Sequence, residues 1–146
     1  MDLALRPSAR CSVNASIAYL DSAFTSVPGG SGLPGLPPGT VQDLKGTPAN
    51  FAPKWSGQAG FDWNGDVGTS GWSWHINGNV SFTSDYRNSA VTDNNPQTIQ
   101  DGFALLGARI ALNAPDERWT VALFGNNLAN KAYSYGSFNQ VLAPQL

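Results

Sequence analysis

Residues 72–86 carry the pattern that constrains this chain most. The odd positions are all polar and the even positions are almost all apolar: Trp72, Trp74, Ile76, Gly78, Val80, Phe82, Ser84 and Tyr86. A strict period of two predicts a β-strand with one apolar and one polar face. Strands of soluble proteins typically have about five or six residues. At ~3.3 Å per residue, this segment is long enough to cross a bilayer at a tilt.

Weaker versions of the same pattern predict further strands. They span residues 2–6, 12–21, 54–63, 102–112 and 119–127. Their connections alternate between short (7–11, 64–71, 113–118) and long (22–53, 87–101, and 127 onward). Antiparallel neighbours send every second connection to the same end, so short turns and long loops collect at opposite ends. The sequence therefore predicts an all-β, antiparallel, up-and-down segment of about six strands from a transmembrane barrel.

Aromatic residues are predicted at both ends of these strands, as in the interfacial girdles of membrane barrels. Those beside a short connection are Trp63, Trp72 and Trp74, and those beside long connections are Tyr19, Trp55 and Tyr86. The longest loop contains the Gly- and Pro-rich run 28–39, which we expect to be exposed and unable to continue a strand ladder.

Composition excludes several other classes of protein. Charged residues make up 12% of the 146 residues, about half of the ~25% usual in globular domains. The net charge of −2 and the dispersed cations argue against a nucleic-acid partner. The single cysteine, Cys11, lies in a predicted turn and excludes a disulfide framework. No apolar run is long enough for a membrane helix, and the N-terminus does not resemble a signal peptide.

Few residues suggest chemistry, and we expect neither enzyme activity nor a cofactor or metal. His75 is the only histidine, so neither a catalytic triad nor a metal triad is predicted. Asp62, Asn64 and Asp66 have half of a calcium-loop spacing but lack its glycine and its final glutamate, which favours a polar turn. Residues 30–35 match G-x-G-x-x-G, but the neighbouring prolines forbid the helix that a nucleotide site needs.

Other polar residues also have ordinary interpretations. Asp85, Asp93 and Asp101 bracket a long loop and are expected to be solvated rather than bound to calcium. Asn14 and Asn79 begin glycosylation sequons inside predicted strands, so we discount both as glycosylation sites.

Several stretches resemble TonB-dependent receptors. Residues 108–112, a short turn, and the strand from Trp119 into Asn127-Leu-Ala-Asn-Lys-Ala-Tyr133 resemble the end of that family's barrel, where an aromatic-led strand enters an Asn-Leu-x-Asp/Asn-Lys/Arg-x-Tyr element. Upstream, Leu44-Lys45-Gly46 followed by residues 52–56 resembles a loop-to-strand junction. Leu5-Arg6-Pro7, before a strand ending Tyr19-Leu20-Asp21, resembles the preceding hairpin. The stretches follow the family's order and span nearly the whole chain.

The resemblance implies part of a 22-stranded barrel of the bacterial outer membrane, occluded by a plug domain. Such a receptor imports a scarce ligand, for example a ferric siderophore, cobalamin or an oligosaccharide, and is energised through TonB. Residues 1–146 then form a near-C-terminal portion of the barrel, and signal peptide, plug and last strand are expected to be absent from it. Implied partners are outer-membrane lipid, the plug, TonB and a small-molecule ligand.

The resemblance also suggests where a ligand would bind. Tyr133, Tyr135 and Phe138 lie in the last long loop, where the family gathers ligand from outside, although girdle or loop packing would also explain them. Arg109, on the inward face, either pairs with plug carboxylates or satisfies neighbouring lumen groups. The alternative functions are a soluble β-sandwich carbohydrate-binding module, which would use the aromatics for sugar stacking, and another outer-membrane barrel such as a porin.

Overall fold

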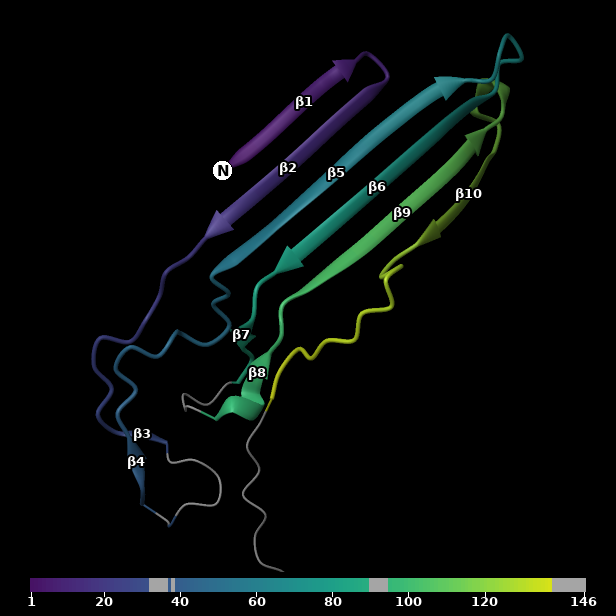
Figure 1. Ribbon diagram of the computed structural model, residues 1–146. Helices are drawn as coiled ribbons and strands as arrows, with labels where there is room; N and C mark the ends of the chain where they lie inside the picture. The colour runs from purple at the N-terminus through teal and green to yellow at the C-terminus, as the bar shows by residue number, and fades with distance from the viewer. Residues whose placement is uncertain (32–36, 38, 90–94, 138–146) are drawn as a thin grey trace, which may run out of the picture. The chain divides into compact units, whose positions relative to one another are not determined.

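The main element of the computed structural model is a six-stranded antiparallel sheet with the order β1-β2-β5-β6-β9-β10 (Figure 1). The structure describes residues 1–31, 37, 39–89 and 95–137. The strands are β1 (Asp2–Ser8), β2 (Cys11–Tyr19), β5 (Trp55–Asp66), β6 (Ser73–Thr83), β9 (Phe103–Asn113) and β10 (Thr120–Gly125). Within the described residues the sheet is open, with β1 and β10 at its edges. The all-β, up-and-down prediction is confirmed.

The chain divides into two compact units. The sheet unit contains residues 1–18, 55–83 and 103–132, and the loop unit contains residues 19–54, 84–102 and 133–146. The loop unit has two small hairpins of its own, β3 (Gly30–Ser31) with β4 (Val41–Gln42) and β7 (Tyr86–Arg87) with β8 (Ile99–Gln100). Short 3-10 helices cover Pro96–Thr98 (η1) and Pro115–Glu117 (η2). No helix in the described ranges is long and apolar enough to cross a membrane.

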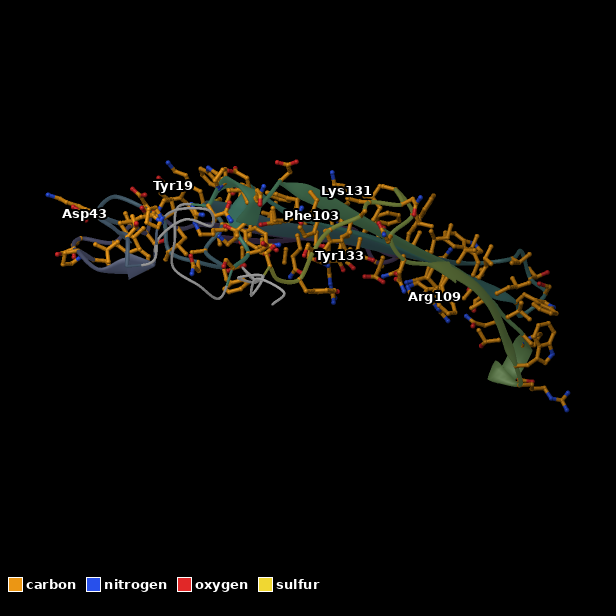
Figure 2. The ribbon with its side chains drawn as sticks, turned by 90° about the horizontal axis from the view of Figure 1, so that it is seen from below. Tyr19, Asp43, Phe103, Arg109, Lys131 and Tyr133 are labelled. Carbon is orange, nitrogen blue, oxygen red and sulfur yellow. The ribbon has the colours of Figure 1, made fainter. Side chains whose placement is uncertain are left out.

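The strand register separates the sheet into an apolar and a polar face. One row across three strands is Trp63–Ile76–Ile110, and the next is Asp62–Asn77–Arg109. Large apolar side chains on the first face remain exposed, for example Trp63 at 49% and Ile110 at 51%. Figure 2, which views the sheet from another side, shows side chains projecting from both faces and labels Arg109. The sheet therefore presents apolar side chains outward.

The strands have the length that a membrane crossing needs. β6 and β9 have 11 residues each, which at ~3.3 Å per residue gives roughly 36 Å. At a tilt of about 45°, such a strand spans roughly 25 Å, the height of the apolar band on a membrane barrel.

The strand β6 is shorter than its sequence pattern. It covers Ser73–Thr83. It ends at Thr83 because its antiparallel neighbours begin there, β5 at Trp55 and β9 at Phe103. Beyond Thr83, neither β5 nor β9 continues alongside the alternating residues. Tyr86, predicted at the end of this strand, instead lies in the β7–β8 hairpin.

The three short turns lie at one end of the sheet, as predicted, but the predicted bounds of all three were wrong, and the third covers residues 114–119 instead of 113–118. Cys11 begins β2 and pairs with Ser8, so the first turn is shorter than residues 7–11. Pro7 remains in β1 at a register irregularity between Leu5 and Ser8. This position suits proline because an edge strand with a bulge tolerates a missing N–H.

The second short turn begins later than predicted. The strand β5 includes Asp62, Asn64 and Asp66, which were predicted to form a polar turn. All three pair with residues of β6 and lie on the polar face. The Val67 N–H donates to the Trp72 carbonyl at 2.8 Å and closes the turn, which leaves Trp72 outside β6.

The loop unit is held around Leu44, which is completely buried. Gly30 lies against the Leu44 side chain, where a Cβ would overlap it. The pairing of Gly30–Ser31 with Val41–Gln42 contradicts the expectation that the Gly- and Pro-rich run 28–39 cannot join a ladder. Glycine permits this short ladder because it leaves room for Leu44.

Candidate ligand-binding site

The element at Asn127 ends the last described strand and directs the chain into the final loop. Asn127 has a φ of +50°, a left-handed conformation that asparagine tolerates well. Its Oδ1 accepts from the Lys131 N–H at 2.9 Å, and its Nδ2 donates to the Lys131 carbonyl at 3.1 Å. The Leu128 N–H donates to the Leu106 carbonyl at 2.9 Å, and the Leu128 side chain lies against Gly125. β10 therefore ends at Gly125, two residues before the predicted end.

The final loop brings Tyr133 and Tyr135 together. Their hydroxyl oxygens are 2.7 Å apart, and their ring centroids are 5.1 Å apart in a T-shaped arrangement. Tyr135 is 85% exposed. Phe138, the third predicted site residue, lies outside the described residues. The described part of the predicted site is thus a paired, solvent-facing set of phenol groups.

The residue between the two tyrosines is anchored by side chains of the preceding loop. The Ser134 N–H donates to Gln100 Oε1 at 2.8 Å, and Asn88 Nδ2 donates to the Ser134 carbonyl at 3.4 Å. Ser137 donates to Asn88 through both its N–H, at 2.8 Å to the carbonyl, and its hydroxyl, at 2.6 Å to Oδ1. The sequence did not identify Asn88 and Gln100 as site residues. They lie 46 and 34 positions from Ser134, and no motif near either residue indicates these contacts.

The pair favours neutral hydroxyl groups. The pKa of Tyr133 is raised above its usual value near 10, chiefly by the hydrogen bond with the Tyr135 hydroxyl. A small loss of hydration and the neighbouring Tyr135 and Tyr86 groups raise this pKa further, since each disfavours the charged phenolate. When the Tyr133 hydroxyl donates to Tyr135, the hydroxyl hydrogen of Tyr135, on a side chain that is 85% exposed, can be donated to a bound molecule.

The polar face of the sheet contains a hydrogen-bonded row. The ring nitrogen Nε2 of His75 lies 3.1 Å from Asp62 Oδ1, to which Asn77 Nδ2 also donates at 3.4 Å. The side chain of Arg109 has no ion pair or hydrogen bond within the part of the chain that the structure describes, although its backbone pairs with Asn77 and Phe124 in the sheet. The structure therefore leaves open both interpretations of Arg109, a plug carboxylate or neighbouring lumen groups.

The remaining candidates are accounted for by their positions. Asn14 and Asn79 lie inside β2 and β6, as predicted for the two sequons. Asp93 and most of the G-x-G-x-x-G run fall outside the described residues. Among the residues that are described, no three His, Cys, Asp or Glu side chains are placed to hold a metal ion.

Aromatic pairs mark the end of the sheet that carries the short turns. Trp63 and Trp74 make a T-shaped contact with centroids 5.0 Å apart, and Trp72 contacts Trp119 in the same manner at 4.8 Å. Trp119 precedes β10 rather than beginning it. One pair joins the ends of β5 and β6 and the other joins two neighbouring short turns, so aromatic side chains gather at this end, as the girdle interpretation expects.

Comparison with known proteins gives one match. Residues 6–128 match the family model described as TonB dependent receptor-like, beta-barrel. Neither a curated protein nor a solved structure matches the chain. The match covers all of β2, β5, β6, β9 and β10, whose antiparallel order fits a barrel wall. Members of this family are outer-membrane receptors that act as transporters rather than enzymes. The chain belongs to the TonB-dependent receptor β-barrel family.

Proposed function

We propose that the sheet is a near-C-terminal portion of the barrel wall of a receptor that imports a scarce ligand across the outer membrane. The ligand is a ferric siderophore, cobalamin or an oligosaccharide, and import is energised through TonB. The family match over residues 6–128 carries this proposal. The strand lengths, the exposed apolar face and the separation of short turns from long connections support it.

The polar face supports an inward orientation. Its row of Asp62, His75 and Asn77 and the uncompensated Arg109 would meet water or a polar domain rather than lipid. Lipid cannot hydrogen-bond such groups, and each unsatisfied group in hydrocarbon costs several kcal/mol. A plug domain inside the barrel is the partner of this face, and outer-membrane lipid is the partner of the opposite one.

The last loop supports a ligand contact outside the barrel. Tyr133 and Tyr135 present ring faces and hydroxyl groups from a long connection rather than from a short turn. Long loops of outer-membrane barrels face the outside of the cell, where a scarce ligand arrives. We assign both residues to the ligand-binding surface.

The test compares ligand uptake by four bacterial strains. They are cells with or without the gene for this protein, each in a strain that has or lacks TonB. The probes are an iron-loaded siderophore mixture, cobalamin and labelled oligosaccharides. We expect uptake of one probe to require both the gene and TonB. Uptake that needs the gene but not TonB would support a porin instead, since diffusion through a pore needs no energy source.

Cell fractionation tests the other alternative. A soluble carbohydrate-binding β-sandwich would remain in solution without detergent, whereas a barrel protein would fractionate with the outer membrane. The exposed apolar side chains on the sheet, including Leu123 at 74%, favour the membrane fraction.

A further inference from the structure

Two side chains of one loop hold both backbone polar groups of Ser134. Gln100 Oε1 accepts the Ser134 N–H, and Asn88 Nδ2 donates to its carbonyl. The Gln100 amide is itself oriented, because its Nε2 donates to the Asp101 carbonyl at 3.0 Å. Asn88 is only 2% exposed, and both atoms of its side-chain amide are hydrogen-bonded. Its Nδ2 donates to the Ser134 carbonyl, and its Oδ1 accepts from the Ser137 hydroxyl. The peptide at Ser134 is therefore held on both sides.

This anchored peptide lies between the two tyrosines. Ser134 is the one residue between the two tyrosines in the chain, and the hydroxyls of Tyr133 and Tyr135 meet at 2.7 Å. Rotation of the Ser134 peptide would separate the two rings. The hydroxyl contact thus depends on Gln100 and Asn88, although neither residue touches a tyrosine hydroxyl.

The anchoring loop is itself constrained by buried polar contacts. The Asn88 N–H donates to the Thr98 carbonyl at 2.9 Å, and Thr98 is 2% exposed. The Arg87 guanidinium donates to the Asn95 carbonyl at 2.9 Å and to the Thr98 hydroxyl at 3.0 Å. Gln100 lies two residues after Thr98, in β8. The side chain that anchors Ser134 therefore extends from a hairpin that these hydrogen bonds stabilise.

We propose that Gln100 and Asn88 are positioning residues that hold Tyr133 and Tyr135 as one preformed hydrogen-bonding pair for the imported ligand. The ligand part rests on the proposed function, whereas the positioning part rests on the contacts alone. Preformed groups bind more tightly because less conformational freedom is lost on binding. The pair suits a ligand that offers an oxygen acceptor beside a flat or C–H-rich surface, which the exposed Tyr135 hydroxyl and the ring faces would contact.

The first experiment measures tyrosine ionisation by near-ultraviolet absorbance, in the protein expressed from its own gene and purified in detergent. Gln100→Ala is compared with wild type, with Gln97→Ala as the matched control because Gln97 is exposed on the same hairpin. Tyr135→Phe removes the pair and serves as the reference. We expect Gln100→Ala and Tyr135→Phe to abolish the same high-pH ionisation step. In both variants the pKa of Tyr133 should return toward the usual tyrosine value of ~10. Gln97→Ala should retain this step.

A conservative variant separates positioning from general loss of structure. Gln100→Glu keeps an acceptor for the Ser134 N–H but loses the donor to the Asp101 carbonyl, so it should retain part of the high-pH step, more than Gln100→Ala does. Amide hydrogen exchange provides a second measurement, in which Gln100→Ala should speed exchange at Ser134 roughly tenfold while the sheet strands are unchanged. An unaltered tyrosine titration in Gln100→Ala would overturn the positioning role.

Uptake kinetics test the ligand part. With the probe that wild-type cells import, Gln100→Ala should raise KM roughly tenfold and leave the maximal rate unchanged. A changed titration with an unchanged KM would overturn the role of the pair in ligand binding. If wild-type cells import none of the probes, the proposed function fails, and the titration still decides whether Gln100 positions the tyrosines.

Discussion

The two units of this chain are stabilised in opposite ways. The sheet unit is joined by backbone ladders and leaves its large apolar side chains exposed, such as Ile110 at 51% and Leu123 at 74%. The loop unit buries polar residues instead: Thr47, Asn88, Ser89, Asn95 and Thr98 are each less than 10% exposed. Its buried polar side chains bond to backbone groups of neighbouring loops, as Asn88 does to Ser134.

The difference follows from what surrounds each unit. A sheet whose apolar face meets lipid needs no apolar core, and its backbone groups are satisfied by neighbouring strands. A set of loops in water has only short ladders and, among its described residues, one buried apolar side chain, Leu44, so hydrogen bonds to buried polar groups act together with that side chain in holding its shape. The predictions below test whether each unit depends on the feature assigned to it.

Leu44→Ala should have the largest effect, because Leu44 is fully buried in the loop unit. Removing such a side chain costs about 2–5 kcal/mol. We expect faster amide exchange throughout the loop unit and little change in the sheet strands. Val41→Ala on β4 is the control, since Val41 is 62% exposed. Equal effects from the two substitutions would show that the loop unit lacks an apolar centre.

Val80→Arg should be the next most damaging, because Val80 lies near the middle of β6 on the apolar face. An arginine facing lipid at the bilayer midplane costs about 2–4 kcal/mol. Urea unfolding from bilayers would measure this free energy. Asn79→Arg, one residue away on the polar face, should be tolerated. If Asn79→Arg proved the more harmful, the assignment of the two faces would be reversed.

Gly78→Ala tests the close packing within the sheet. A Cβ at Gly78 would overlap the Phe61 ring, which covers it on the apolar face. We expect a loss of about 1–3 kcal/mol in unfolding free energy. The same substitution in a Phe61→Leu background should cost less, and additive losses would exclude the ring contact as the cause.

Asn127→Leu tests the junction between the sheet and the last loop. It removes both hydrogen bonds to Lys131 and places leucine at a positive φ, which leucine tolerates less well than asparagine. A loss of about 1–2 kcal/mol is expected. Asn127→Gly restores the backbone conformation but not the bonds, so its unfolding free energy should lie between wild type and Asn127→Leu.

The smallest expected effect concerns alkaline pH. The pKa of Tyr133 is raised in the folded chain, so the protonated phenol favours the folded loop. This contribution is fully present below the usual tyrosine pKa of ~10 and is lost as pH rises through the raised value. Limited proteolysis should then cut near residues 133–137 while the sheet stays intact, and Tyr135→Phe should remove this alkaline step.

The number of strands in the sheet, and which of their residues share a face, could be predicted from the sequence because the period of two is a local property. Residues 73–83 alternate regardless of their partners, and the structure pairs them accordingly. Strand ends could not be predicted in the same way. The alternation continues to Tyr86, but β6 ends at Thr83, the last of its residues that pairs with both neighbouring strands.

The candidate site was only partly visible in the sequence. Tyr133 and Tyr135 were identified from their place in a long loop, and the structure brings them together. Their anchors, Asn88 and Gln100, are unremarkable as sequence and become significant only through contacts with Ser134.

The sequence by itself therefore determined the strand pattern, the two faces and the division between short turns and long connections, because each depends on residues near one another in the chain. Only the tertiary structure decided where the strands stop and how the loops join. Pairing partners and buried hydrogen bonds link residues that are tens of positions apart, as Asn88 and Ser134 are.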